Sequence, residues 1–183
     1  TSLNGPRSVT TSSNYLYVTS STGKSLTTFN ITNPATPVQT AYYTNATSLY
    51  WPTSVTTSGN YLYVASYFGN SLTTFNITNP ATPVQTAHYT NETSLNHPHS
   101  VTTSNNYLYV ASDYGNSLTT FNITNPATPI QVAYYANAAS LNNPRSVTAS
   151  GNYLYVASIT GNSLTTFDIS PLPSQLIASN FST

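Results

Sequence analysis

The chain has 183 residues, of which only three are Lys or Arg and three are Asp or Glu, and it has no cysteine. So few cations cannot neutralise a run of phosphates, which argues against nucleic acid as a partner, and the lack of cysteine excludes disulfides and thiolate metal sites. No run approaches the roughly 18 apolar residues that a membrane span needs, so membrane insertion is not expected.

The sequence repeats one unit four times. The units begin at Thr1, Thr47, Thr93 and Ala139, so the expected blades cover residues 1–46, 47–92, 93–138 and 139–183. A period of this length is typical of stacked structural units that share a core. We therefore expect one domain over residues 1–183. The net charge of zero gives little repulsion between copies of the chain.

Each unit opens with a β-prone segment of small side chains, which is Pro52–Ser58 in the second unit. The tripeptide Ser58-Gly-Asn60 suits a tight hairpin, because these residues tolerate a positive φ. In the next segment, Tyr61–Ser66, Leu and Val alternate with Tyr and Ala, so both faces of the strand are apolar. This pattern indicates a sheet that is covered on both faces.

The second half of each unit also predicts strands. In the second unit, Ser71–Ile77 again has apolar residues on both faces. The two prolines of Thr78–Pro83 exclude a helix and predict a turn. The segment Val84–Tyr89 mixes apolar and polar residues, as expected of an outer strand that meets solvent. Nothing in the chain predicts a helix.

Four short antiparallel strands per unit predict an all-β fold, a β-propeller of four repeated four-stranded antiparallel blades. Small residues suit the first strand because blades converge at the axis, and face-to-face packing of blades covers both sides of the middle strands. Four blades can close into one ring or form half of a larger ring, and the sequence leaves both open. A parallel β-solenoid is the alternative, but its coils have shorter periods and lack hairpin signals.

Two motifs of the second unit carry a resemblance to a known family. Ser58-Gly-Asn-Tyr-Leu-Tyr-Val-Ala-Ser66, followed by Phe75-Asn-Ile-Thr-Asn-Pro-Ala-Thr-Pro-Val84, resembles the LVIVD-type propeller repeat, and Leu16-Tyr-Val-Thr19 resembles the related YVTN repeat. The resemblance covers all four units and implies propeller blades of a surface protein, but little about activity. Where the family usually has Asp after the hydrophobic residue of the third strand, this chain has Asn30, Asn76 and Asn122 and retains Asp only at Asp168.

The four units differ from one another mainly in two loops, one before the first strand and one between the second and third strands. In an up-and-down blade both loops emerge at the same edge, so we expect any ligand recognition there, with relaxed drift of the loops as the alternative. The candidate binding residues in these loops are Arg7, Tyr50, Trp51, Tyr67, Phe68, His97, His99, Asp113, Tyr114 and Arg145.

Two groups among these candidates suggest particular chemistry. Trp51, the only tryptophan, and its aromatic neighbours can stack on sugar rings, or they can simply pack between adjacent blades. His97, His99 and Asp113 have the side chains of a metal site, because His-x-His places two imidazoles on one side of an extended segment. A third histidine in register is missing, so we expect no metal and no cofactor.

Catalysis is poorly supported by the sequence. The carboxylates are Glu92, Asp113 and Asp168, and Asp168 stands where the other units have a turn-forming Asn. A glycosidase needs two carboxylates at a set separation, and only Glu92 and Asp113 can share a site. No nucleophile motif or phosphate loop is present. The expectation is that the chain is not an enzyme.

Asn-x-Ser/Thr sequons are the most repeated chemical signal, although each match is weak in a chain rich in Asn and Thr. The side chains of three of them are expected to cap turns. The two at the end of the fourth strand, Asn45 and Asn91, are therefore the expected glycan carriers. The sequons stand at Asn30, Asn45, Asn76, Asn91, Asn122 and Asn180.

These features predict an extracellular or surface structural or adhesive module that is glycosylated and assembles with copies of itself, as in a fibre or filament. The expected partners are therefore the chain itself and glycans. A lectin-like module that binds carbohydrate through the variable loops is the alternative, and a hydrolase is a third hypothesis.

Overall fold

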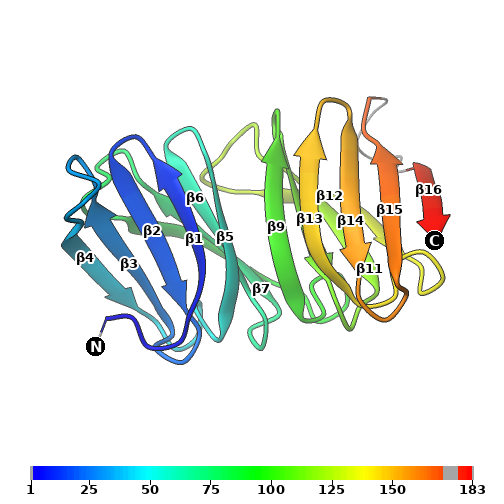
Figure 1. Cartoon of the computed structure of the whole chain (residues 1–183), viewed down its shortest axis with the longest axis horizontal. Helices are drawn as coiled ribbons and strands as arrows, with labels where there is room; N and C mark the ends of the chain where they lie inside the picture. The colour runs from blue at the N-terminus through cyan, green and yellow to red at the C-terminus, as the bar shows by residue number, and fades with distance from the viewer. Residues whose placement is uncertain (1, 171–176, 183) are drawn as a thin grey trace. The chain divides into compact units, whose positions relative to one another are not determined.

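The computed structural model describes residues 2–170 and 177–182, with side chains over 2–170. Over these residues the chain forms only strands and loops, and it has no helix that is long and apolar enough to cross a membrane. The chain divides into two compact units, Thr1–Thr90 and Asn91–Thr183, which are described one at a time (Figure 1). The single domain expected over residues 1–183 stays a prediction.

The first unit contains two four-stranded antiparallel sheets, each with its strands in chain order. The strands of the first sheet are β1 (Pro6–Ser12), β2 (Tyr15–Ser20), β3 (Ser25–Asn30) and β4 (Val38–Thr44). The strands of the second sheet are β5 (Pro52–Ser58), β6 (Tyr61–Ser66), β7 (Ser71–Asn76) and β8 (Val84–Thr90).

The second unit repeats this arrangement with a third and a fourth sheet. The strands of the third sheet are β9 (Pro98–Ser104), β10 (Tyr107–Ser112), β11 (Ser117–Asn122) and β12 (Ile130–Ala136). The strands of the fourth sheet are β13 (Pro144–Ser150), β14 (Tyr153–Ser158), β15 (Ser163–Asp168) and β16 (Ile177–Ser182). Every sheet lies within one expected blade, so the prediction of antiparallel propeller blades is confirmed and the parallel solenoid is excluded.

The first hairpin of each sheet turns on a residue with a positive φ, as the tripeptides predict. The φ values are 51° at Ser13, 54° at Gly59, 52° at Asn105 and 56° at Gly151. A Cβ built at Gly59 would meet no heavy atom within 4 Å. The turn therefore requires the left-handed conformation and not the absence of a side chain, which explains why Ser and Asn replace Gly in two repeats.

The linker between consecutive sheets is an asparagine-capped turn that buries a leucine. In the first unit, Oδ1 of Asn45 accepts hydrogen bonds from the main-chain N–H groups of Thr47 (2.9 Å) and Ser48 (3.0 Å), and Leu49 is fully buried. The main-chain oxygen of Ser48 in turn accepts a 2.6 Å hydrogen bond from Oγ1 of Thr73. Asn91 and Asn137 make equivalent turns in the second unit, so the same capped turn precedes the first strand of the second, third and fourth sheets.

The core of each unit is the contact between its two sheets. In the first unit, Tyr17 and Leu26 of the first sheet pack with Val55, Val64 and Phe75 of the second sheet. These side chains are almost completely buried, and each contributes about 1.5–3 kcal/mol through the hydrophobic effect. The apolar character of both strand faces is thus explained by sheets that cover one another.

The second unit has an equivalent core. Tyr109 and Leu118 of the third sheet pack with Val147, Val156 and Phe167 of the fourth. The edge-to-face ring pair of this core, Tyr135 with Phe167 at 5.2 Å between centroids, has its counterpart in the first unit, Tyr43 with Phe75 at 5.1 Å. The cores of the two units therefore have the same packing.

The first and last strands of the sheets occupy the places that the composition predicts. Small residues let first strands approach one another, and the main-chain N–H of Val55 on β5 donates to Oγ of Ser8 on β1 at 3.2 Å. Val147 on β13 makes the equivalent bond to Ser100 on β9 at 3.1 Å. The fourth strands β4, β8 and β12 have mostly exposed or half-buried residues, so they are outer strands.

The buried tyrosines predict a loss of stability at alkaline pH. Burial, with a smaller contribution from the neighbouring Tyr15, raises the pKa of Tyr17 to about 12. The unfolded-state pKa is about 10, so the folded state holds the proton longer. The contribution of the Tyr17 hydroxyl to the free energy of unfolding is complete below about pH 10 and is lost as the pH rises toward 12. Denaturant unfolding from pH 8 to 11 should show this decrease, and the decrease should be shallower in Tyr17→Phe. Equal slopes in the two proteins would contradict the prediction.

Candidate functional site

The two variable loops of each repeat lie side by side at one edge of its sheet. In the second sheet, the main-chain N–H of Tyr67 donates to the oxygen of Trp51 at 2.8 Å. In the third sheet, the N–H of Asp113 donates to the oxygen of His97 at 3.1 Å, and the first and fourth sheets have equivalent bonds. The predicted shared edge is thus present in every repeat, and we call it the loop edge.

A left-handed residue stands at the same position in all four loop edges, just before the first strand. The φ values are 68° at Gly5, 63° at Trp51, 58° at His97 and 61° at Asn143. A bulky residue in this conformation costs about 1–3 kcal/mol, and such strain persists only where the surroundings enforce it. The main-chain hydrogen bonds between the two loops enforce it here. Trp51 and His97 therefore project from a fixed backbone.

The first unit presents a cluster of four aromatic side chains at its loop edge. The ring of Phe68 lies at its centre, with centroid distances of 5.0 Å to Tyr67, 5.3 Å to Trp51 and 5.8 Å to Tyr50. Tyr50 is 42% exposed and Phe68 is 46% exposed. We call these four residues the aromatic cluster. It offers a preassembled apolar surface to solvent.

Two cations lie against the aromatic cluster. The guanidinium carbon of Arg7 is 5.5 Å from the centroid of the Trp51 ring, and Nζ of Lys24 is 4.7 Å from that of Tyr50. Such cation–π contacts contribute about 0.5–1 kcal/mol at exposed sites. The structure thus brings together Arg7 with the predicted aromatic residues. Lys24 was missed by the sequence reasoning, although it differs from the Asn of the other three repeats at this position.

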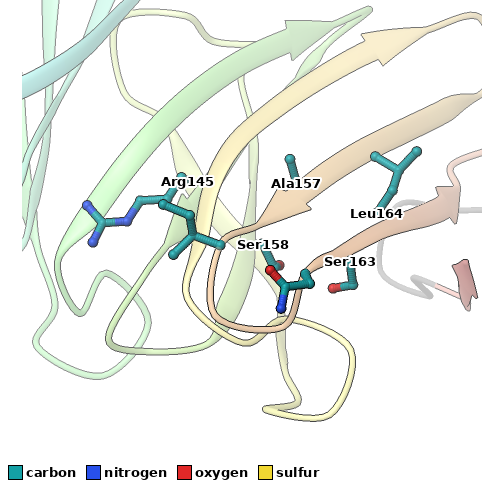
Figure 2. Close-up of a pocket in the computed structure, with 7 residues that line it drawn as sticks. Arg145, Ala157, Ser158, Ser163 and Leu164 are labelled. Atoms are coloured by element: carbon teal, nitrogen blue, oxygen red, sulfur yellow. The ribbon is translucent and has the colours of Figure 1, made fainter. Parts of the chain in front are cut away.

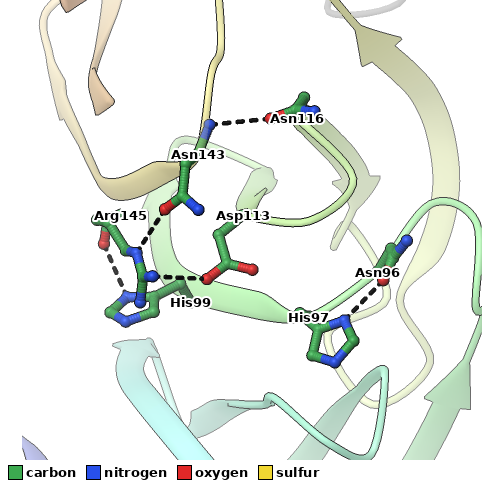
Figure 3. Close-up of polar contacts among 7 residues, drawn as sticks. All are labelled: Asn96, His97, His99, Asp113, Asn116, Asn143 and Arg145. Atoms are coloured by element: carbon green, nitrogen blue, oxygen red, sulfur yellow. Dashed lines mark hydrogen bonds and ion pairs between the residues drawn. The ribbon is translucent and has the colours of Figure 1, made fainter. Parts of the chain in front are cut away.

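The second unit has polar groups at its loop edge in place of the aromatic cluster (Figure 3). Asp113 is buried, and its Oδ2 lies 3.3 Å from Nη2 of Arg145. Nε of Arg145 donates to Oδ1 of Asn143 at 2.7 Å, and the main-chain oxygen of Arg145 accepts a 3.0 Å bond from Nδ1 of His99. We call these four residues the polar cluster. Asn143 is a member that the sequence reasoning missed, and only its place in a variable loop pointed to it.

The polar cluster joins a loop of the third sheet to a loop of the fourth. The guanidinium of Arg145 spans this junction, and the N–H of Asn143 adds a 2.9 Å bond to Oδ1 of Asn116. A buried carboxylate without a cation is strongly unfavourable. Arg145 is 37% exposed at its side chain while Asp113 is not exposed. Asp113 therefore depends on this one cation.

The two histidines do not converge as the metal hypothesis required. His97 donates from Nδ1 to Oδ1 of Asn96 at 2.7 Å and stacks on Tyr114 with 4.6 Å between centroids. His99 instead bonds to Arg145. The expected His-x-His geometry fails because His97 has a left-handed φ of 58°, so the segment is not extended there. Among the described residues, no group of three or more His, Asp or Glu side chains is arranged to hold a metal.

The carboxylates stand in different surroundings. Glu92 is exposed in the turn after β8, whereas Asp113 is buried beside Arg145. The expectation that these two share a site is therefore not supported by the contacts of either. Asp168 is the last residue of β15 and caps the turn that follows. Its Oδ1 accepts bonds from Oγ of Ser170 (2.6 Å) and N–H of Ser170 (2.8 Å), which lower the pKa of its carboxyl.

The structure removes the reason for ranking the sequons. Asn30, Asn76 and Asn122 do cap turns, each accepting a bond from the N–H two residues later. Asn45 and Asn91, however, cap the linker turns in the same way, and all five are half-buried. The expected difference between the two groups therefore has no basis in side-chain bonding. The side chain of Asn180 lies outside the described residues.

The comparisons with known proteins fit this geometry. The sequence pattern of the LVIVD repeat matches residues 6–45, 53–91, 97–137 and 143–183. No sequence relative was found among curated proteins.

Among solved structures, a candidate 6-phosphogluconolactonase from Bacteroides uniformis superposes with a TM-score of 0.84 at 16% identity, over 97% of this chain and 55% of that one. The periplasmic gluconolactonase of Pseudomonas aeruginosa superposes with 0.80 at 17% identity, over 97% of this chain and 53% of that one. This chain spans about half the length of both. The designed protein Ika4 superposes with 0.66 at 10% identity, over 91% of this chain and 92% of Ika4.

These structures correct the expectation that the chain is not an enzyme. Two of the proteins with which it shares its fold are named as lactonases, so the expectation is contradicted. Its reasoning failed because motif searches look for local patterns, such as a nucleophile elbow. A site assembled from loops of several blades needs no such motif.

Because of the buried ion pair, replacing Arg145 should reduce the stability of the protein more than replacing Arg7, the equivalent arginine of the first repeat. Arg145→Met leaves Asp113 without a cation and should destabilise the protein by about 1–3 kcal/mol, a range lowered because Arg145 is partly exposed. Arg7→Met is the matched control, because residues 1–90 contain no carboxylate side chain; its effect should be below about 1 kcal/mol. Denaturant unfolding measures both, and adding Asp113→Asn to Arg145→Met should restore part of the loss. Equal effects of the two single variants would contradict this assignment.

Proposed function

The chain belongs to the LVIVD repeat family, and on that premise we propose that it is an extracellular or surface module with a structural or adhesive role. It acts as a glycosylated subunit that associates laterally with copies of itself. Its working partners are then other copies of the chain.

The observation that supports this proposal most is the surface of the outer strands. Val38 on β4 is 61% exposed, Val84 on β8 is 61% exposed and Ile130 on β12 is 64% exposed. Tyr42 and Tyr134 on the same strands are 47% and 41% exposed. Exposed sheet edges with apolar residues favour pairing between chains, and proteins usually prevent this with charge. These strands contain no charged residue at all.

The form of the outer strands limits that pairing. The outer strands β4, β8 and β12 each have a one-residue irregularity in their pairing with the third strand, between Thr28 and Phe29 in the first sheet and at equivalent places in the next two, whereas β16 pairs without one. A bulge interrupts the row of edge hydrogen bonds. Contacts along the outer strand are therefore short, which suits regular assembly better than unlimited strand addition.

The sequons support an extracellular place for the module. Asn45 and Asn91 lie between strands, and Asn30, Asn76 and Asn122 are the last residues of β3, β7 and β11, so each glycan would stand at or beyond the end of a strand. Glycans at Asn45 and Asn91, directly after the outer strands β4 and β8, would shield part of each edge by bulk. The chain has too little charge to shield these edges by electrostatic repulsion.

Charge placed on the outer strands should prevent lateral assembly. For the triple variant Val38→Lys, Val84→Lys, Ile130→Lys, the concentration that gives half-assembly should rise about tenfold, which equals about 1.4 kcal/mol. The control variant places the same three charges in exposed hairpin turns, as Asn14→Lys, Asn60→Lys and Asn106→Lys. It should change the concentration that gives half-assembly only a little. Light scattering over a wide range of protein concentration measures both. Equal assembly by the two variants, or no assembly of the parent chain, would refute the proposal.

A second candidate function is carbohydrate binding at the aromatic cluster. The exposed rings of Tyr50 and Phe68 around Trp51 favour it, because such surfaces stack on sugars. The lactonase names of the two similar structures also direct attention to sugar-derived ligands.

Loss of the Trp51 ring should weaken such binding. On a glycan array and in titrations with gluconolactone, Trp51→Ala should weaken binding about tenfold or more, since buried aromatic anchors contribute most to affinity. Tyr153→Ala is the control, because Tyr153 is exposed on β14 and lies outside the loop edge. Binding that survives in Trp51→Ala, or that is absent in the parent, would exclude this site.

A further inference from the structure

The sheets of this protein have two chemically distinct faces, which meet in the same way in both units. In the first sheet, one face carries Leu26 and Tyr17. We call this face, and the equivalent face of every other sheet, the leucine face. The opposite face carries Val55 and Val64 in the second sheet, and we call it the valine face. The core of the first unit joins the leucine face of the first sheet to the valine face of the second. The core of the second unit joins the equivalent faces of the third and fourth sheets.

Within the first unit, no sheet covers the valine face of the first sheet. Val9 on β1 is 57% exposed, whereas the equivalent Val55 and Val147 are 6% and 5% exposed. A shallow pocket is formed there by Val9 and Val18 with Pro6, Arg7 and Ser8. The second sheet cannot cover this face, because it packs on the other side of the first sheet.

Within the second unit, no sheet covers the leucine face of the fourth sheet. Leu164 on β15 is 44% exposed, whereas the equivalent Leu26 and Leu118 are 1% and 0% exposed. Leu164 pairs with Ala157 of β14, and the two contribute to a pocket of about 520 Å³ at this face, shown in Figure 2. Single exposed apolar residues are ordinary, but an open face whose equivalents are buried elsewhere indicates a missing partner.

We infer that a second copy of this chain supplies that partner, through a head-to-tail contact in which the valine face of the first sheet of one copy packs on the leucine face of the fourth sheet of the other. The contact would repeat, position for position, the packing that is already present within each unit. Val9 would take the place of Val55 and Val147, and Leu164 that of Leu26 and Leu118. No new kind of interface is needed.

Charge favours the head-to-tail arrangement over a head-to-head one. The charged side chains of residues 1–90 are Arg7 and Lys24, and those of residues 91–183 are Glu92, Asp113, Asp168 and Arg145. The first part of the chain is thus positive and the second part negative. Two first sheets would bring four cations together, whereas the fourth sheet carries one cation, Arg145, which is paired with Asp113, and one carboxylate, Asp168.

Chain length also favours a second copy. Two copies have about the length of one chain of the similar natural structures, of which this chain covers 55% and 53%. A head-to-tail contact is heterologous, so two copies complete a ring if the rotation closes and form an open filament if it does not. The contact does not depend on the lateral assembly proposed above, because it uses faces of the sheets and not their outer strands.

Cross-linking between two different single-cysteine variants tests this contact, since the natural chain has no cysteine. Val9→Cys and Leu164→Cys proteins are mixed and treated with a short bis-maleimide. The expected product is a covalent pair of about 39 kDa, twice the chain mass of 19.6 kDa, that contains one chain of each kind by mass spectrometry. Either variant alone should give little of it.

Two controls keep the result specific. Val38→Cys mixed with Leu164→Cys should give little product, because Val38 is on an outer strand. The outer-strand triple lysine variant should still give the Val9–Leu164 product, so that failure of lateral assembly is distinguishable from failure of the head-to-tail contact.

Three outcomes would overturn the inference. No mixed product would show that the faces do not meet between copies, as when one chain closes its own ring. Equal product with Val38→Cys would show unspecific association. Loss of the product in the lysine variant would show that the contact depends on the outer strands. Circular dichroism of each cysteine variant confirms that it is folded before it is used.

Discussion

Face-to-face packing of sheets is the interaction on which this structure depends. A four-stranded sheet with apolar residues on both faces is insoluble alone, and each face must be covered by another sheet. The contact between a leucine face and a valine face meets this need, and it recurs with equivalent residues in both units. The capped linkers around Leu49 and Leu141 belong to the same cores, so connection and packing reinforce one another. With almost no charge in the chain, ion pairs cannot take over this role.

The sheets could be predicted from the sequence in detail, for reasons that particular residues show. The alternation in Tyr61–Ser66 indicates a strand with two buried faces. The small residues of Pro52–Ser58 indicate a first strand that packs too closely on its neighbours for large side chains. Ser13 and Asn105 report the left-handed hairpin turn as well as Gly59 does. All of these are local signals that repeat four times, which makes chance agreement improbable. The division into two units could not be predicted, because the junction at Thr90 and Asn91 has the same sequence pattern as the linker at Asn45.

The loop edge was predicted as a place but not as a set of contacts. Variation among the repeats identified the two loops, and the main-chain bonds between them confirm that they adjoin. The metal hypothesis failed at His97, because a left-handed backbone before a proline redirects the imidazole. The pairing of Asp113 with Arg145 crosses from one repeat to the next, and no spacing rule within a repeat contains it. Two similar structures are named as lactonases, and no short motif in this sequence pointed to that comparison.

Near-identity of the faces has a consequence for how the chain finds its native pairing. Because the valine and leucine faces of the repeats are built from equivalent residues, we expect a folding intermediate that skips a repeat to bury almost the same apolar surface as the native order. What distinguishes correct neighbours is then the small number of contacts that occur once. Asp113 with Arg145 marks the third and fourth repeats as neighbours, and Arg7 over Trp51 marks the first and second. The variable loops thus specify which repeats become neighbours, because the cores are built from equivalent residues and do not distinguish one repeat from another.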